Sequence, residues 1–206
     1  MSERTSSRRL RVGLALALLA LALLLMSAGA YATFTSDASD SQALTSGTLS
    51  LALGAVGAET NRLTVAASNI APGATIERTV DLINDGTLPL GAVTLTTSAL
   101  TSSLLDQDAT DGLQMEIAAC SVPWTESGVA PAYVYSCSGS TSSVLSSLPI
   151  IGSDLSLNNL TPIEPGATVH LLLTLSLPTI ASNLLQGLTS TVQYAFTGVQ
   201  GAASND

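Results

Sequence analysis

The stretch VHLLLTLSL at residues 169–177 decides the fold class of this chain. Every second position in it is apolar: Val169, Leu171, Leu173, Leu175 and Leu177. An extended backbone sends alternate side chains to opposite faces, so these five side chains share one face. Pro165-Gly166 predicts the turn before the run, and Pro178 ends it. The stretch therefore predicts a β-strand with one face in a core.

The same alternation recurs outward from this stretch. It predicts strands at residues 47–53, 62–67, 75–84, 91–98, 113–120, 133–137 and 189–199, and one weak strand within residues 148–160. We expect residues 133–137 to pair near 113–120. Residues 99–105 and 180–185 are expected to be short helices or turns, and the serine-rich residues 138–147 a loop. Many strands without a long helix predict an all-β fold, an antiparallel β-sandwich.

Turn signals separate the predicted strands. Asn84-Asp85-Gly86 is a strong one, and Asp-Gly often closes hairpins, so we expect a hairpin there. Residues 69–75 and 159–168 resemble each other, because each contains a Pro-Gly-Ala-Thr turn that opens a long strand. Two equivalent corners of one sandwich would produce this likeness.

A basic stretch, an apolar run and small residues open the chain. Four arginines lie before residue 12, an uncharged run follows at residues 12–26, and two exits fit the small-x-small pattern, Ala28-Gly29-Ala30 and Ala30-Tyr31-Ala32. The run of about 15 residues is shorter than the ~20 residues that a spanning helix needs. We predict a helical, cleaved secretory signal at residues 1–32, with an uncleaved anchor as the alternative.

The chain after residue 32 is acidic. It keeps only Arg62 and Arg78 as cations, has no lysine, and carries 14 carboxylates from Asp37 to Asp206. This composition excludes nucleic-acid binding, because phosphate contacts need lysine and arginine. Cations, other proteins and cell-wall material are the partners that such a surface suits, and the charge also favours solubility outside the cell.

Cys120 and Cys137 are the only cysteines. An isolated pair in an oxidising compartment usually forms a disulfide. The loop that it would close contains Trp124 and is about 17 residues long, for which the chain-entropy estimate is roughly 3 kcal/mol. We therefore predict a Cys120–Cys137 disulfide.

The sequence offers no recognisable catalytic constellation. His170 is the only histidine and lies on the face of its strand opposite the leucines, so a zinc site with several histidines is excluded. No Gly-x-Ser-x-Gly elbow is present. We predict no catalytic residue, no metal ligand and no cofactor.

Residues 106–112 form an acidic loop that contains Asp106, Asp108 and Asp111. Calcium takes oxygen ligands from such loops, but the twelve-residue pattern fails here: no glutamate closes it and Gly112 is misplaced. We interpret the segment as a solvated loop, with calcium binding as the alternative.

Residues 33–47 make a short segment that is mostly polar on either side of Phe34. An extended terminal segment can add to a neighbour's sheet edge through backbone hydrogen bonds, and this contact, repeated head to tail, builds an open filament. The alternative is a frayed terminus. Residues 48–200 are then the sandwich domain, and residues 201–206 a flexible tail.

Several motifs follow one another in order along the chain. They are Ala30-Tyr31-Ala32, Thr33-Phe34-Thr35-Ser36-Asp37, Ser46-Gly47-Thr48-Leu49-Ser50-Leu51, Ser68-Asn69-Ile70-Ala71-Pro72-Gly73, Asn84-Asp85-Gly86-Thr87-Leu88, Leu185-Gln186-Gly187 and Tyr194-Ala195-Phe196-Thr197-Gly198-Val199-Gln200. In this order they resemble the TasA and camelysin-like proteins of Gram-positive bacteria, from the aromatic-Ala cleavage site to the closing strand.

The resemblance implies a jelly-roll-like sandwich in a secreted protein of the extracellular matrix or cell surface. It implies cleavage between Ala32 and Thr33 by a SipW-like signal peptidase. It also implies a structural subunit of biofilm-matrix fibres, which donates a strand containing Thr33, Phe34, Thr35 and Asp37 to the next copy. Other matrix proteins or the cell wall are further partners. The alternatives are a secreted camelysin-like metallopeptidase, whose ligands the chain lacks, and a non-assembling surface binding module.

Overall fold

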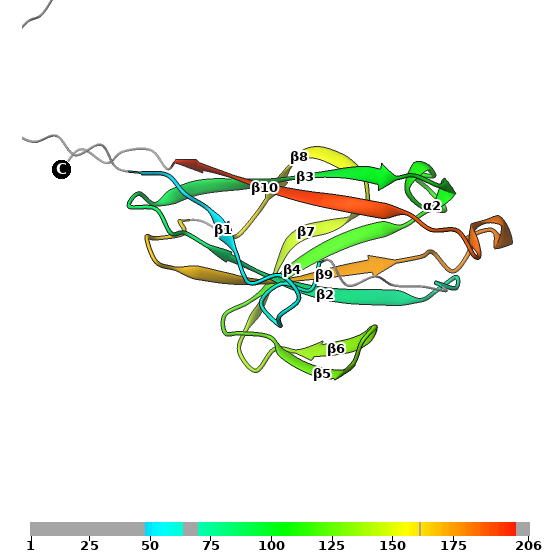
Figure 1. The fold of residues 1–206 in the computed structure, drawn as a ribbon, viewed down its shortest axis with the longest axis horizontal. Coiled ribbons are helices and arrows are strands. Elements are labelled where there is room, and N and C mark those ends of the chain that lie inside the picture. The colour runs from blue at the N-terminus through cyan, green and yellow to red at the C-terminus, as the bar shows by residue number, and fades with distance from the viewer. Residues whose placement is uncertain (1–47, 64–69, 161, 201–206) are drawn as a thin grey trace, which may run out of the picture. The chain divides into compact units, whose positions relative to one another are not determined.

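Eight strands form an antiparallel, jelly-roll-like β-sandwich, and two more form a separate hairpin, within residues 48–63, 70–160 and 162–200, which are the residues that this computed structural model describes (Figure 1). The strands are β1 (Ala52–Leu53), β2 (Thr75–Ile83), β3 (Leu90–Thr101), β4 (Gln114–Cys120), β5 (Thr125–Val129), β6 (Ala132–Ser136), β7 (Thr141–Pro149), β8 (Gly152–Leu157), β9 (Thr168–Ser176) and β10 (Thr191–Gln200). In the same ranges the helical pieces are α2 (Leu104–Gln107) and the 3-10 turn η1 (Asn183–Leu185). The all-β prediction is confirmed. No helix in this part of the chain has the length and apolar character to cross a membrane.

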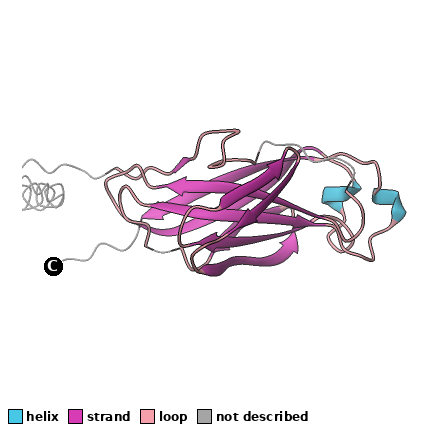
Figure 2. Cartoon of the chain, turned by 90° about the horizontal axis from the view of Figure 1, so that it is seen from below, coloured by secondary structure: helices cyan, strands magenta, loops and turns pink. Residues whose placement is uncertain are grey.

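Two sheets make the layers of the sandwich. One has the strand order β1-β2-β9-β4-β7 and the other the order β10-β3-β8. In Figure 1 the three-stranded sheet lies above the five-stranded sheet, and the β5–β6 hairpin lies below both. The two helical pieces lie together at one end of the sandwich (Figure 2).

The strand β9 is the centre of the five-stranded sheet, as its alternation predicts. Leu171, Leu173 and Leu177 are at most 1% exposed. They belong to one core cluster with residues from β2, β3 and β4: Val80, Leu82, Leu90, Val93, Leu95, Met115 and Ile117. Burying one such side chain stabilises a fold by about 1.5–3 kcal/mol. The leucine face of β9 therefore fixes where the core lies.

The two Pro-Gly-Ala-Thr turns occupy equivalent corners, at opposite ends of the β2–β9 pair. In each turn the residue after the glycine donates its N–H to the carbonyl three residues earlier, at 2.9 Å. Gly73 and Gly166 have φ of 81° and 78°, which the third position of a type II turn requires. Their N–H groups donate to Leu177 O and Asn84 O respectively. The predicted equivalence of the two corners is confirmed.

The expected hairpin at Asn84-Asp85-Gly86 is wrong. The flanking strands β2 and β3 belong to different sheets, so this segment carries the chain across the sandwich. Asn84 is fully buried, and its amide donates to Leu88 O at 2.9 Å and to Ile163 O at 2.8 Å. Its Oδ1 accepts from the Gly86 N–H. The bond to Ile163 ties the turn residues to a distant segment and makes them a corner between sheets.

Two predictions about the segments near the β5–β6 hairpin are also wrong. The serine-rich loop expected at residues 138–147 largely forms β7, in which Val144 and Leu145 are both buried. The register against β4 shifts at this point, which turns two consecutive side chains inward and breaks the alternation that sequence analysis relies on. The strand β6 pairs with β5, which was not predicted, and not with β4.

The first strand expected in the domain is shorter than predicted, and most of the second lies outside the described residues. Only Ala52–Leu53 of the expected strand at residues 47–53 forms β1. The preceding Thr48 instead exchanges hydrogen bonds of 2.8 Å with Thr87 in the β2–β3 connection. Of the strand expected at residues 62–67, Arg62 donates its N–H to Thr79 O of β2, and residues 64–67 lie outside the described ranges.

Candidate functional site

The strand β10 has one edge that no strand of the described part of the chain covers. Its other edge pairs with β3 along its whole length, from Thr191 opposite Thr101 to Gln200 opposite Leu90. The sheet order β10-β3-β8 ends at β10. An open edge presents a row of backbone N–H and C=O groups that a further strand can bind.

The core is incompletely covered at this edge. Val192, Tyr194 and Phe196 alternate along β10 and pack against the core, yet all three stay partly exposed. On the neighbouring strand β3, Val93 and Leu95 are at most 1% exposed. Burial is nevertheless sufficient to raise the pKa of Tyr194 to about 12. The apolar interior of the sandwich thus reaches the surface along β10.

The open edge lies in an uncharged part of an acidic protein. Residues 165–200 include no Asp, Glu, Lys or Arg, although the whole chain has 15 carboxylates. A segment that binds along β10 would therefore meet no charge on that strand. Like charges placed opposite each other in a sheet are destabilising, so this absence favours strand addition.

The described chain begins beside the C-terminal end of β10. Leu51 lies against Gly198, where an added Cβ would come within 3.6 Å of the Leu51 Cβ. The segment that precedes Thr48 is therefore joined to the sandwich at this end. The predicted cleavage and donor residues lie outside the described ranges, and their roles stay predictions: Ala32, Thr33, Phe34, Thr35 and Asp37.

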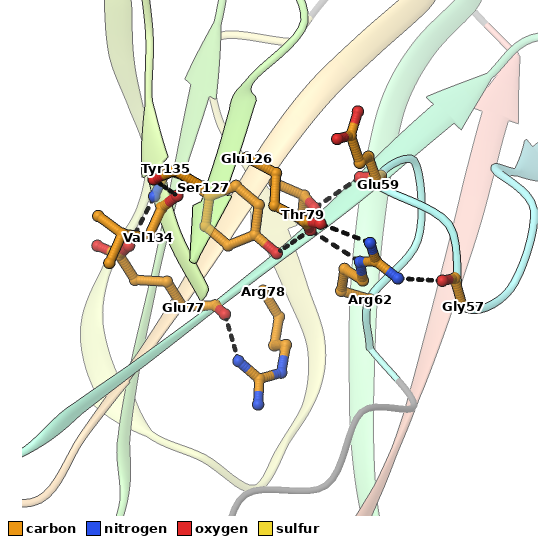
Figure 3. Close-up of polar contacts among 10 residues, drawn as sticks. All are labelled: Gly57, Glu59, Arg62, Glu77, Arg78, Thr79, Glu126, Ser127, Val134 and Tyr135. Carbon is orange, nitrogen blue, oxygen red and sulfur yellow. Dashed lines mark hydrogen bonds and ion pairs between the residues drawn. The ribbon is translucent and has the colours of Figure 1, made fainter. Parts of the chain in front are cut away.

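The β5–β6 hairpin is fastened to the five-stranded sheet by a cluster of polar side chains (Figure 3). Arg62 donates from Nε to Glu126 Oε2 at 2.7 Å and also binds Gly57 O, while the Tyr135 hydroxyl donates to the same carboxylate at 2.8 Å. The Arg62 hydrogen bond lowers the pKa of Glu126 and raises the pKa of Arg62. Burial, together with the bond to Glu126, raises the pKa of Tyr135 to about 12.

The second arginine joins the same cluster. The Tyr133 ring lies 4.7 Å from the Arg62 guanidinium carbon and 5.8 Å from that of Arg78. Arg78 is 4% exposed and donates to Glu77 O at 2.6 Å and to Pro131 O at 3.2 Å. Both cations of the described part of the chain therefore hold the hairpin. The sequence alone did not indicate this cluster, because its members are far apart along the chain.

The predicted disulfide is confirmed. Cys120, the last residue of β4, is bonded to Cys137, which follows β6. Close to it the Trp124 indole N–H donates to His170 O at 3.1 Å. The disulfide and Trp124 fix the residues where the hairpin leaves and rejoins the five-stranded sheet. Arg62 and Arg78, which we call the arginine cluster, bind the hairpin itself.

Among the described residues, the side chains that could ligate a metal do not come together. His170 Nδ1 lies 2.8 Å from Asp81 Oδ1, and both cysteines are in the disulfide. Within residues 48–63, 70–160 and 162–200 no three His, Cys, Asp or Glu side chains are placed to hold one ion. A catalytic zinc needs three protein ligands and an open position, so the described residues do not fit it.

The acidic residues of the 106–112 loop build local structure. Asp106 is buried and accepts hydrogen bonds from Ser102 Oγ at 2.6 Å, from Ser103 N at 2.7 Å and from Ser190 Oγ. It thereby completes a capping box at the start of α2. Asp108 accepts from two backbone N–H groups of the same loop, at 2.9 Å each. The interpretation as a solvated loop is wrong for Asp106, which ties α2 to the start of β10.

Replacing Asp106 with asparagine is expected to reduce stability more at pH 7 than at pH 3. Burial alone would raise the pKa of Asp106, but the hydrogen bonds from Ser102, Ser190 and Ser103 outweigh it and hold the pKa below its ordinary value. A lowered carboxyl pKa stabilises the fold above the ordinary value of about 4, and that contribution disappears as the pH falls through the folded-state value. Urea unfolding at pH 7 and pH 3 measures the difference. The exposed aspartate in Asp85→Asn is the control, and an Asp106→Asn deficit that is equal at both pH values would contradict the prediction.

Comparisons with known proteins identify one family. Residues 7–119 match the family described as Camelysin metallo-endopeptidase. No curated protein matches the chain. A solved structure described as "AvmM Catalyzes Macrocyclization in Alchivemycin A Biosynthesis" is 13% identical, with a TM-score of 0.31, over 76% of this chain and 91% of that chain. A likeness of that size carries no argument about fold or activity.

Proposed function

This chain belongs to the Camelysin metallo-endopeptidase family, and we propose that it acts as a secreted structural subunit of extracellular, biofilm-matrix fibres. In this proposal a SipW-like signal peptidase cuts after Ala32. The released segment that begins at Thr33 adds as a strand to the next copy, head to tail. Other matrix proteins or the cell wall are further contacts of the fibre.

The open edge of β10 is the observation that carries the proposal. A strand bound there would pair with the free backbone groups of β10 and would cover Val192, Tyr194 and Phe196. The donor and the edge are different surfaces of the same chain. Such a heterologous contact repeats without closing unless the rotation between copies happens to form a ring, so it builds filaments.

The direction and length of the chain suit this arrangement. β10 runs from the end that carries α2 (Figure 1) toward the end where its Gly198 lies against Leu51, three residues after Thr48. A donor that leaves one copy at its Thr48 end and enters the next copy at its α2 end is antiparallel to β10. Residues 33–45 span roughly 43 Å when extended, and the ten residues of β10 about 33 Å, so the segment is long enough to cover the edge.

Peptidase activity, which the family's description names, is not part of the proposal. The described residues do not bring a zinc ligand set together, and His170, the sole histidine of the sequence, is paired with Asp81.

Deleting residues 33–45 is expected to abolish filaments. Protein that starts at Thr33 should form filaments in electron micrographs at concentrations where the deletion variant stays monomeric by light scattering, because the variant keeps the β10 edge but has no strand to donate. Added peptide with the sequence of residues 33–45 should bind the variant one to one.

Three results would contradict the proposal. The first is protein from Thr33 that remains monomeric at every concentration and pH tried. The second is N-terminal sequencing of the secreted protein that begins at a residue other than Thr33. The third is stoichiometric zinc in the purified protein together with chelator-sensitive cleavage of casein, which would favour the peptidase.

A further inference from the structure

Exposed leucine and isoleucine side chains gather at the end of the sandwich that carries α2 and η1. We call this surface the apolar cap and define it by Leu100, Leu104, Ile180, Leu184 and Leu188. Leu100, Ile180 and Leu184 are 68%, 76% and 75% exposed. Exposed apolar side chains that occur singly are ordinary, whereas several at one place mark an interaction site.

The members of the apolar cap come from two segments that the fold brings together. Thr101, at the end of β3, pairs with Thr191, at the start of β10. Ser103 Oγ lies 2.7 Å from Ser190 Oγ, and Asp106 binds Ser190 as well. These bonds fix α2 beside the β9–β10 connection, which contains η1, and Figure 2 places both helical pieces at one end. The apolar cap is therefore held in place by the fold.

The opposite end of the same sheet also exposes apolar side chains. Leu49 is 44% exposed and Val199 is 49% exposed. Val199 lies opposite Ala92 near the start of β3, and Leu49 follows Thr48, which is bonded to Thr87 in the β2–β3 connection. Nearly the whole of β10, about 30 Å, separates this end from the apolar cap. The two apolar ends therefore cannot cover each other within one molecule.

We propose that the apolar cap is the seat for a second copy of this chain, bound through the end that carries Leu49 and Val199. This inference rests on the proposed function, since a donor that leaves the Thr48 end brings that end to the apolar cap of the next copy. The donor would then supply strand pairing along β10, and the two ends would supply apolar burial where the molecules abut.

The charges favour a second copy over a lipid surface as the occupant. Leu100 and Leu104 lie in the uncharged residues 86–105, and the other members of the apolar cap lie in the uncharged residues 165–200. The members of the apolar cap therefore bring no charge of their own to the contact. The nearest carboxylate in sequence, Asp106, is buried and bonded to serines, and Asp108 and Asp111 follow α2 in the same loop. Binding to an anionic membrane needs basic residues near the apolar anchor. Arg62 and Arg78, the cations of the described ranges, are engaged with the β5–β6 hairpin instead.

The test compares Ile180→Asp/Leu184→Asp with Val129→Asp in protein that starts at Thr33. Val129 is 78% exposed on the β5–β6 hairpin and serves as a matched control away from the apolar cap. The double variant should raise the critical concentration for filaments at least about tenfold, because burying one aliphatic side chain contributes that much to an association constant. Val129→Asp should assemble as the unsubstituted protein does. Thermal unfolding should be unchanged in both, since all three positions are exposed.

A mixing experiment separates this inference from the proposed function. The apolar-cap double variant keeps its donor, and the variant lacking residues 33–45 keeps its apolar cap. Mixed in equal amounts, they should form one-to-one dimers that do not grow, because only one productive contact is available. Leu100→Ser, a milder change, should raise the critical concentration in the same direction.

The outcomes are distinguishable. If unsubstituted protein never assembles, the proposed function fails. If it assembles, needs residues 33–45, and the double variant assembles at the same concentration, the proposed function stands and the role of the apolar cap is wrong. Binding of the unsubstituted protein to phosphatidylcholine vesicles that the double variant loses, with assembly unchanged, would assign the apolar cap to a lipid surface and would also overturn the inference.

Discussion

Replacing Cys120 and Cys137 together with serine is expected to lower the free energy of unfolding by about 3 kcal/mol, the chain-entropy value for a loop of this length. The loss has a local component as well. The bridge joins the end of β4 to the residue after β6, so without it the hairpin is held by non-covalent contacts, chiefly those of Arg62, Arg78 and Trp124. Urea unfolding of the oxidised protein and of the double variant measures the total, and hydrogen exchange at β5 and β6 measures the local part.

Ser136→Ala is the matched control, because this exposed β6 residue lies next to the bridge. It should leave the unfolding midpoint within experimental error. Equal stabilities of the oxidised and double-serine proteins would contradict the prediction. So would thiols that react with a labelling reagent in the native protein before any reductant is added.

Replacing Asn84 with alanine is expected to cost about 3 kcal/mol or more, since three side-chain hydrogen bonds of a fully buried residue disappear. The change leaves a carbonyl at Leu88 without this donor inside the protein. It also loosens the crossing between sheets, because the Asn84 backbone binds the second Pro-Gly-Ala-Thr corner through Ala167 O and Gly166 N. The free energy of unfolding in urea is the measurement.

Two companion variants sharpen the result. Asn84→Asp keeps the size and the acceptor for Gly86 but cannot donate to Leu88 O or Ile163 O, so its loss should be at least as large as that of Asn84→Ala. Asn158→Ala, at an exposed asparagine, should be nearly neutral. A loss below about 1 kcal/mol for Asn84→Ala, which is the value of one ordinary hydrogen bond, would show that this corner does not depend on the asparagine.

Local patterns predicted those strands whose two faces differ. β9 repeats its leucines at every second position, and β2 and β10 alternate similarly, so each was found close to its observed bounds. The strand β7 was missed because its buried Val144 and Leu145 are adjacent at a register shift and its other positions are mostly serine. The hairpin expected at Asp85-Gly86 failed because a turn signal states that the chain bends but does not state which sheet the next strand joins.

The open edge of β10, the arginine cluster and the apolar cap could not be predicted from the sequence. The alternation of Val192, Tyr194 and Phe196 predicted a strand, but only the sheet order shows that its outer edge is free of described partners. Arg62 and Glu126 are 64 positions apart, so no local pattern could pair them. The apolar cap likewise needs the β3 and β10 ends side by side before its leucines form one surface.

The sequence by itself determined the all-β class, the leucine face of β9, the pairing of the only two cysteines and the acidic charge. These follow from backbone geometry within a strand and from residue counts, which need no knowledge of contacts. The tertiary structure alone decided which strands are neighbours, why Asn84 is a corner residue, and that β10 and the apolar cap lie at the surface. Those features depend on burial and hydrogen bonds between residues far apart in the chain, whose energies exist only once the two sheets have packed.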